Sequence, residues 1–266
     1  ADFSVTEAGL KETVRQVILP IWNSWYFLSL YANAAGVSGR FRTDQTDVLD
    51  RYLLAELGDL VRSVTHHMDD YDLFSACHSI GGFLDTLTNW YIRRSRDRFW
   101  TGDQDAVDTL HTAIATLCRV AAPLLPITVE HVYCALTGEP SVHLTDWPDA
   151  SVFPSDPDLT SGMQQARAVC STILSMRKAH SIRVRQPLAR AMVAQHGSIE
   201  LLRPHLELIQ DEVNVKALDL STDVARYATF EVQVVPARLG PRLGGDTQKV
   251  IRAVKAGDWS EDGARV

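Results

Sequence analysis

The sequence predicts a mainly α-helical protein, in which an antiparallel helical bundle is followed by a small α/β domain. The bundle is predicted by four long segments between residues 6 and 122, which have apolar residues at helical spacing and short connections. The α/β domain is predicted by strand-like alternation, which first appears after residue 180. A stretch rich in Pro, Asp and Ser ends at Asp158, so we expect one domain at 1–155 and the other at 156–266.

The first two bundle helices are expected over residues 6–35 and 47–68. Thr6 is the predicted N-cap of the first helix. Pro20 is expected to kink that helix, because proline cannot donate a helical hydrogen bond. The second helix has apolar residues at positions i, i+3, i+4 and i+7, which is the pattern of a helix that buries one face.

The third helix is expected over residues 73–99 and ends in the sequence NWYIRRSRDRFW, which we call the arginine block (residues 89–100). Helical spacing assigns Tyr91 to the apolar face. It assigns a second, polar face to Asn89, Arg93, Arg96 and Trp100. Two adjacent glycines in mid-helix cost about 1 kcal/mol each relative to Ala. We therefore expect a neighbouring helix to approach closely at Gly81 and Gly82.

The remaining elements follow from the same spacing rules. Helices are expected over 104–122 and 128–136, followed by an irregular passage over 141–158. In the second domain we expect helices over 159–179, 198–210 and 246–256, and strands over 191–194, 214–220 and 227–235.

Composition limits the classes of function. The net charge of −7 excludes a protein that coats nucleic acid with its whole surface, so any nucleic-acid site must be a local basic patch. Cys77, Cys118, Cys134 and Cys170 are widely spaced and form no CxxC pair, which indicates reduced thiols and a cytoplasmic location. His131 and Cys134 share a helix face, but without further ligands nearby we expect them to pack rather than bind metal. No apolar run approaches the ~20 residues of a membrane span.

The arginine block has the composition of an RNA-binding segment. It combines four arginines with four aromatic residues in twelve positions. Cations beside flat aromatic faces bind phosphates and stack on unpaired bases, so we expect an RNA loop to dock here. The alternative is a structural helix end, whose aromatic residues are in the core and whose arginines are solvated or paired with Asp and Glu.

A second basic segment covers residues 177–190. It contains no acid and five positively charged residues: Arg177, Lys178, Arg183, Arg185 and Arg190. This segment is either a second RNA-facing patch or a connector that forms salt bridges with acidic helices.

The sequence contains no convincing catalytic set. It has no GxGxxG in a strand–turn–helix setting, no GxxxxGK[ST], no HExxH and no GxSxG motif, and its nine histidines are scattered. We therefore expect no catalytic residue, metal or cofactor in this chain.

Ordered motifs along the whole chain resemble the C-terminal part of isoleucyl-tRNA synthetases, a family of class I aminoacyl-tRNA synthetases. In the first domain they are LPIWNSWYF (19–27), LDRY (49–52), the arginine block, and SVHL with DWP (141–148). In the second domain they are RK (177–178), IRVRQPL (182–188), NVK (214–216) and LGPRLG (239–244). The bundle motifs are shared with valyl and leucyl relatives, whereas VRQPL, NVK and LGPRLG are more specific to the isoleucyl family. The WYIRRSR form resembles the eukaryote-like branch, which also occurs in some bacteria.

The resemblance implies a helical-bundle anticodon-binding domain followed by an α/β junction domain. It implies a longer parent enzyme that joins isoleucine to its tRNA and hydrolyses mischarged valine. That parent uses ATP with magnesium, and zinc is a further candidate. The HIGH and KMSKS signatures of the family's ATP site are absent here, and the chain begins without Met. We therefore expect an excised, non-catalytic, tRNA-binding fragment.

On this resemblance, both basic regions are expected to contact the anticodon stem-loop of isoleucine tRNA. The expected contact residues are Asn89, Trp90, Arg93, Arg94, Arg96, Arg98, Trp100, Arg177, Lys178, Arg183 and Arg185. The expected partners are this tRNA and the catalytic domain of the same chain, and we expect a monomer without membrane contact. Two other interpretations remain: a helical interaction module without RNA binding, and the equivalent region of a valyl or leucyl relative.

Overall fold

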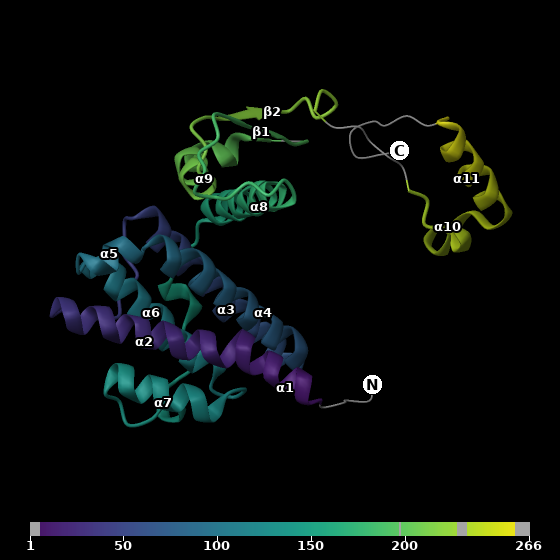
Figure 1. Ribbon diagram of the computed structural model, residues 1–266. Helices are drawn as coiled ribbons and strands as arrows, with labels where there is room; N and C mark the ends of the chain where they lie inside the picture. Colours follow the sequence, from purple (N-terminus) through teal and green to yellow (C-terminus); the bar gives the residue numbers. More distant parts are fainter. Residues whose placement is uncertain (1–5, 197, 228–232, 259–266) are drawn as a thin grey trace. The chain divides into compact units, whose positions relative to one another are not determined.

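The computed structural model describes residues 6–196, 198–227 and 233–258 (Figure 1). The chain divides into two compact units, of which unit 1 ends at Thr160 and unit 2 begins at Ser161. The sequence places the domain boundary five residues earlier, at 155/156. Helices account for most of the described residues, which confirms the predicted mainly α class.

The first long helix is continuous but is built of three segments: α1 (Glu7–Thr13), η1 (Val14–Ile18) and α2 (Leu19–Ala35). The Thr6 hydroxyl accepts a hydrogen bond from the Gly9 amide at 3.0 Å, which confirms the predicted N-cap. The middle segment η1 is π-helical, and Pro20 lies in the first turn of α2 directly after it. The helix therefore accommodates the proline through a turn with π-helical hydrogen bonds directly before it.

Two helices form the centre of unit 1, α3 (Val48–Asp69) and α6 (Gln104–Ala121). Their N-terminal amides are capped by Asp47 and Asp103, whose carboxylates accept hydrogen bonds at 2.8 Å and 3.1 Å. Helix α6 contacts α2, α3 and α7 (Pro126–Thr137). Its apolar residues at helical spacing are all buried: Val107, Leu110, Ile114, Leu117 and Val120. Burial on several sides makes α6 the central helix of the bundle.

The connection between α2 and α3 lies along α6. The backbone amides of Arg40 and Arg42 donate to Asp108 Oδ1 and Thr112 Oγ1, both at 2.9 Å. These hydrogen bonds give partners to polar groups that are buried on α6, as buried polar groups require.

The third predicted helix, 73–99, is interrupted. It consists of α4 (Leu73–Asp85), the π-helical η2 (Thr86–Ile92), two further helical residues and α5 (Arg96–Trp100), with a break at Ser95. The close approach expected at Gly81 and Gly82 is wrong for the part of the chain that the structure describes, where no neighbouring atom lies within 4 Å of a Cβ built on either glycine.

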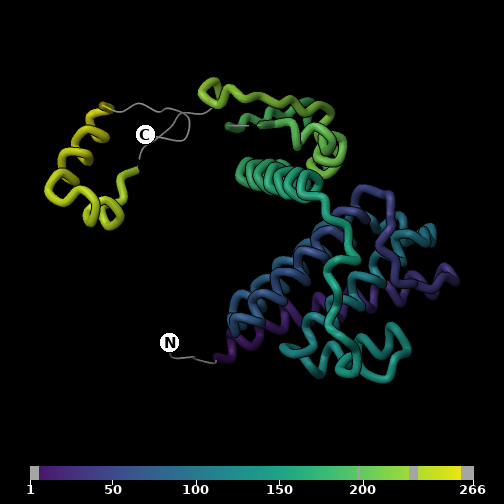
Figure 2. The backbone as a smooth tube through the Cα atoms, turned by 180° about the vertical axis from the view of Figure 1, so that it is seen from behind, coloured from purple at the N-terminus to yellow at the C-terminus, as the bar shows by residue number. Residues whose placement is uncertain are grey.

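The passage after α7 is irregular, as predicted, apart from the short turns η3 (Val142–Leu144) and η4 (Ala150–Val152). The Glu130 carboxylate on α7 accepts a hydrogen bond from the Val142 amide at 2.8 Å. The Trp147 indole N–H donates to the Thr65 hydroxyl on α3 at 2.8 Å. These contacts hold the passage against the bundle, which it crosses in Figure 2.

Unit 2 contains a two-stranded parallel sheet of β1 (Ala191–Ala194) and β2 (Leu218–Ser221), in which Ala191 pairs with Leu218. The strands are connected through η5 (Glu200–His205) and α9 (Leu206–Val213), the crossover that parallel strands need. Helix α8 (Pro157–Ala179) lies directly against η5, because a Cβ at Gly162 would be 2.6 Å from the Leu201 carbonyl oxygen.

The last described elements are α10 (Pro236–Leu243), η6 (Gly244–Asp246) and α11 (Thr247–Ala256), which contact one another. The LGPRLG motif forms the end of α10 and the start of η6. Of the strand expected over 227–235, residues 228–232 lie outside the described residues. In the described ranges, no helix has both the length and the apolar character needed to cross a membrane.

Candidate nucleic-acid interface

The polar face predicted for the arginine block is exposed on unit 1. Asn89, Arg93, Arg96 and Trp100 are all at the surface, and Trp100 is 64% exposed. Arg93 Nε donates a hydrogen bond to the Asn89 carbonyl at 2.8 Å, and Asn89 Nδ2 donates to Asp85 Oδ1 at 2.7 Å. These bonds run along the helical segment, so they orient its polar side chains without burying them.

Trp90 lies on the inner side of the same segment. It is only 4% exposed, so its ring has no free face for an RNA base. The Arg94 and Arg93 guanidinium carbons lie 5.6 Å and 6.0 Å from its ring centroid, within the range of cation–π contact. Trp90 therefore supports the two arginines, which corrects its expected role as an RNA contact.

Arg98 is held inside unit 1 by carboxylates. Its Nη1 and Nη2 donate to the two Asp50 oxygens at 2.9 Å and 2.7 Å, and its Nε donates to Asp103 Oδ2 at 2.9 Å. The Tyr91 hydroxyl donates to Asp50 Oδ1 at 2.7 Å, and both of these residues are 0% exposed. Arg98 was expected to contact RNA, but its guanidinium is bound by these carboxylates. For this residue the structure agrees with the alternative in which the arginines pair with Asp and Glu.

Burial and charge act against each other in this cluster. Burial raises the pKa of Asp50, and hydrogen bonds from Arg98 and Tyr91 oppose this rise without cancelling it. The pKa of Tyr91 lies well above its ordinary value, first because of burial and then because of the Asp50 charge. Burial also acts to raise the pKa of Asp103, but hydrogen bonds from Arg98 and the Ala106 amide outweigh it, so that pKa is lowered.

Asp50 is a structural residue that sequence reasoning missed, although a signal was present. It lies three residues before Leu53 and seven before Leu57, on the apolar face of a predicted helix. An acid on a buried face needs a cationic partner, because an unpaired buried charge is strongly disfavoured. The arginine block, in the same bundle, contains that partner.

In unit 2, Arg177 is buried and bound to backbone carbonyls. It is 2% exposed, and its Nη1 donates to the carbonyls of Arg183 and Gln186 at 3.2 Å and 3.0 Å. Its Nη2 donates to the Asn214 carbonyl at 2.8 Å, and Asn214 Nδ2 donates to the Val184 carbonyl at 2.9 Å. Arg177 therefore holds the loop that follows α8, which corrects its expected role as an RNA contact.

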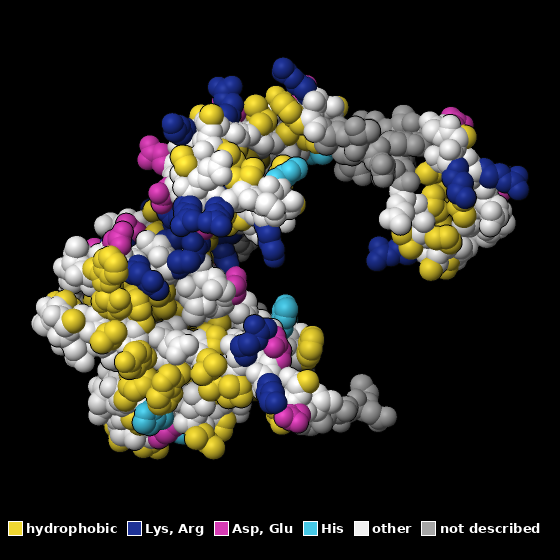
Figure 3. Space-filling view, in the orientation of Figure 1, with side chains coloured by type: hydrophobic (Ala, Val, Ile, Leu, Met, Phe, Trp, Pro, Cys, Tyr) yellow, Lys and Arg dark blue, Asp and Glu magenta, His cyan; other side chains and the backbone are white. Residues whose placement is uncertain are grey.

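The loop that Arg177 holds displays the other cations of the basic segment. Lys178, Arg183 and Arg185 are exposed, whereas Arg190 forms an ion pair with Asp219 at 2.7 Å. Positively charged side chains thus lie on parts of both units and leave much of the visible surface uncovered, as Figure 3 shows. Each unit carries a local basic surface, which is what the acidic net charge requires of a nucleic-acid site.

Metal-binding clusters do not occur in the described part of the chain: no group of three or more His, Cys, Asp or Glu is placed to hold an ion there. The expected packing of His131 is confirmed, since its ring stacks on Trp22 with centroids 5.2 Å apart. The four cysteines are free.

Comparison with known proteins identifies relatives of this chain. Residues 50–193, just over half of the chain, match the family model "Anticodon-binding domain of tRNA ligase". The chain is 52% identical over 257 residues to "Isoleucine--tRNA ligase" of Nocardia farcinica and 52% identical over 265 residues to that of Corynebacterium efficiens. It is 50% identical over 254 residues to that of Mycobacterium tuberculosis. These alignments cover 97%, 98% and 96% of this chain but 24%, 25% and 24% of the relatives, so the chain spans about a quarter of their length.

The resemblance inferred from the motifs is confirmed by these relatives. The three relatives are named as isoleucine ligases, so the interpretation as a valyl or leucyl equivalent is not favoured. The match to an anticodon-binding family likewise does not favour a scaffold module without RNA binding.

Proposed function

The chain belongs to the family of anticodon-binding domains of tRNA ligases, and on this premise we propose that it binds the anticodon stem-loop of isoleucine tRNA. One observation carries the proposal. Within the family match, Arg93, Arg96 and Trp100 are exposed on one short segment, while neighbouring Trp90 and Arg98 are occupied inside the protein. The exposed guanidiniums bind phosphates, and Trp100 offers a ring on which an unpaired base stacks.

Unit 2 supplies a second phosphate-binding surface in this proposal. Lys178, Arg183 and Arg185 lie around a loop whose backbone is held by the buried guanidinium of Arg177. A loop held in one conformation loses less entropy on binding, which favours affinity. This surface binds the sugar–phosphate backbone and therefore contributes affinity rather than sequence preference.

The relatives are longer proteins, of which this chain spans about a quarter. Because the relatives are named as isoleucine--tRNA ligases, we propose that the longer protein joins isoleucine to its tRNA. In that protein ATP with magnesium acts outside this chain, zinc is a further candidate, and the catalytic domain is the intramolecular partner. We propose that this longer protein is cytoplasmic, since its substrate is tRNA. We also propose that it acts as a monomer.

The test is a titration of this chain with a synthetic anticodon stem-loop of isoleucine tRNA and with anticodon variants, over a series of salt concentrations. We expect weaker binding of the variants. We also expect log K to fall linearly with log salt, with a slope of about 0.7–0.9 per phosphate contacted. The charge-reversed variant Arg93→Glu/Arg96→Glu is expected to lose binding. Arg62→Glu, at an exposed position of α3, is the matched control.

Three results contradict the proposal: affinity that does not depend on ionic strength, anticodon changes without effect, or equal affinity of the charge-reversed variant and its control. In the last case the arginine block is a protein interface, a role in which Arg and Trp are also common.

A further inference from the structure

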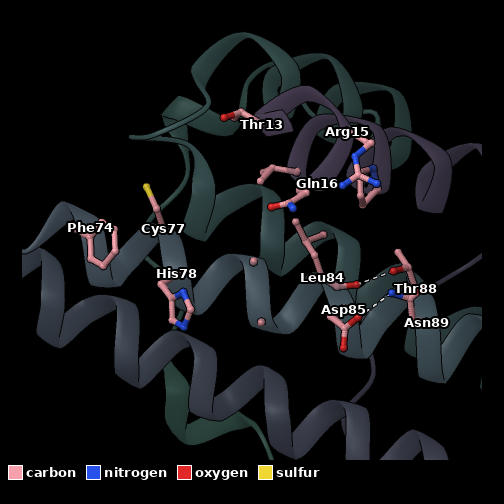
Figure 4. A pocket seen from close by; sticks show the side chains of 14 residues that line it. Thr13, Arg15, Gln16, Phe74, Cys77, His78, Leu84, Asp85, Thr88 and Asn89 are labelled. Carbon is pink, nitrogen blue, oxygen red and sulfur yellow. Dashed lines mark hydrogen bonds between the residues drawn. The ribbon is translucent and has the colours of Figure 1, made fainter. Parts of the chain in front are cut away.

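A groove of about 810 Å³ lies in unit 1, between the first long helix and the segment formed by α4 and η2 (Figure 4). Its volume is in the range of small-molecule and cofactor sites. Gln16 and Val17 line it from the first helix, Gly81 and Gly82 line it from α4, and Asn89 lines it from η2.

Two π-helical segments contribute to the lining of this groove. Arg15, Gln16 and Val17 belong to η1, and Thr88 and Asn89 belong to η2. π-Helical segments are rare and are frequently found at functional sites. Pro20 accounts for η1, whereas η2 contains neither proline nor glycine, so η2 is the segment that points to a use of the groove.

The two glycines of α4 are not required by packing inside the protein. Glycine lowers helix stability, yet among the described residues no neighbouring atom lies within 4 Å of a Cβ built on Gly81 or Gly82. Neither glycine has a positive φ, so the backbone conformation does not need glycine either. What the pair provides is a stretch of bare backbone in the groove, against which a flat group from outside can lie.

The groove is continuous with the exposed face of the arginine block. Asn89 belongs to both, and Arg93 Nε donates to the Asn89 carbonyl at 2.8 Å. Arg96 follows three residues after Arg93, across the break at Ser95, and is exposed like Arg93. An RNA strand whose phosphates contact Arg93 and Arg96 therefore passes the mouth of the groove.

We propose that this groove binds one unpaired nucleobase of the RNA strand that contacts Arg93 and Arg96. The inference rests on the proposed function and names a subsite within it. The base lies against the backbone of Gly81 and Gly82, and its edge meets the polar side chains of the rim. Thr88 is one of these, and its hydroxyl already donates to the Leu84 carbonyl at 2.8 Å, so it presents acceptor lone pairs to a base amino group.

The chemistry of the lining favours a base over an apolar protein segment. Half of the lining residues are polar: Thr13, Arg15, Gln16, His78, Asp85, Thr88 and Asn89. A base edge carries donors and acceptors that such a rim can satisfy, whereas an apolar helix leaves them unpaired.

The first experiment covers the bare backbone of the groove with a methyl group without disturbing the fold. Gly81→Ala and Gly82→Ala add a methyl group where there is room, so we expect Tm to stay equal or to rise. We expect affinity for the anticodon stem-loop to fall about fivefold, because the added methyl group separates the base from the helix backbone and removes close contacts. Gly240→Ala is the matched control, because Gly240 also lies inside a helix with no atom within 4 Å of an added Cβ.

The second experiment asks whether a single base occupies the groove. Each loop nucleotide is replaced in turn by an abasic nucleotide, and affinity is measured for the wild-type chain and for Gly82→Ala. We expect one abasic substitution to weaken binding to the wild-type chain and to have no further effect on Gly82→Ala, because both changes remove the same contact. Additivity at every loop position overturns the proposal.

Cysteine protection gives an independent readout. Cys77 is exposed and lines the groove, whereas Cys134 is partly exposed and does not line it. Saturating stem-loop is expected to slow alkylation of Cys77 and to leave Cys134 unchanged. An unchanged Cys77 rate, or stem-loop affinity unaltered in both alanine variants, overturns the groove inference while the proposed function stands. If the wild-type chain does not bind the stem-loop, both fail.

Discussion

The two basic regions of this chain are built on the same plan but are anchored by different chemistry. In each, one arginine is turned inward and its neighbours remain exposed. In unit 1 the inward residue is Arg98, which is bound by the Asp50 and Asp103 carboxylates. In unit 2 it is Arg177, which is bound by three backbone carbonyls.

The comparison shows that some arginines of a basic segment stabilise the fold while others remain exposed on the surface. We call each inward arginine with its partners an anchor. The partners of the unit 1 anchor are charged, so loss of the guanidinium strongly lowers stability by leaving a buried carboxylate unpaired. Neutral carbonyls make the unit 2 anchor insensitive to pH. Counting arginines as RNA contacts therefore overestimates the binding surface of both regions.

The largest expected effect is from Arg98→Met. The substitution leaves the fully buried carboxylate of Asp50 without its cation, so we expect the free energy of unfolding to fall by about 3–5 kcal/mol. Urea denaturation measures the loss. The control Arg96→Met removes an exposed arginine and should change stability by no more than about 0.5 kcal/mol. Equal stability of the two variants contradicts the assigned anchor, and Asp50→Asn/Arg98→Met should recover part of the loss.

A smaller loss is expected from Arg177→Met, because the partners left behind are neutral. Hydrogen bonds to a charged group contribute about 1.5–3 kcal/mol, and we expect a net loss of about 2–3 kcal/mol in unit 2. The local readout is hydrogen exchange at the amides of Ile182 and Gln186, which are bonded within the loop at 2.8 Å and 3.0 Å. Both amides should exchange faster, whereas Lys178→Met should leave them protected. Unchanged exchange in Arg177→Met would show that the loop does not depend on this anchor.

The exposed pairs allow the two surfaces to be compared in RNA binding. Arg93→Gln/Arg96→Gln and Arg183→Gln/Arg185→Gln each remove two cations from the surface without breaking an anchor. If every cation meets one phosphate, each double variant lowers the slope of log K against log salt by about 1.4–1.8. Titration with the stem-loop at several salt concentrations measures the slope, and Arg203→Gln is the control in unit 2. A slope that changes for one pair only assigns the RNA backbone to that unit alone.

The smallest expected effect is a dependence of folding stability on pH, which the unit 1 anchor has and the unit 2 anchor lacks. Because the pKa of Asp103 is lowered in the folded state, its contribution to stability is present above its unfolded value of about 3.9. The contribution is lost as the pH falls through the lower, folded-state value. Asp50 has the opposite shift, so it does not add an acid dependence of this sign.

The test of that dependence is Asp103→Asn, since Asn keeps the N-cap of α6 and removes only the charge. We expect a loss below about 1 kcal/mol at pH 7, and a smaller decrease in urea midpoint between pH 5 and pH 3 than in the wild-type chain. The same decrease in both proteins contradicts the role given to Asp103.

The bundle was predictable because its information is local. Val107, Leu110 and Ile114 repeat at helical spacing, and such a stripe is stable only when it is buried. The interruption at Ser95 was not predictable, because neither proline nor glycine marks it. The π-helical segment η2 likewise has no composition that marks it, whereas η1 lies directly before Pro20.

The roles of individual arginines depend on residues far away in the sequence. Arg96 and Arg98 are chemically identical, and they differ because Asp50, 48 residues before Arg98, lies opposite only one of them. Arg177 was harder still to assign, since its partners are the carbonyls of residues 183, 186 and 214. Every residue has a carbonyl, so no side-chain pattern marks these partners. The polar face of the arginine block, in contrast, followed correctly from spacing alone.

The π-helical segment Thr86–Ile92 allows the arginine block to keep its direction when this stretch loses one residue. An α-helix advances about 100° around its axis with each residue, and a π segment holds one residue more than an α-helix closing the same turn. Deletion of one codon from this stretch would restore a regular helix and leave later side chains in about the same direction relative to α4, because the extra residue of a π segment adds no net rotation. Deletion of one codon from α4 would instead rotate the arginine block by about 100°. In evolutionary terms, η2 is the part of this helix whose length can change by one residue without redirecting the basic surface.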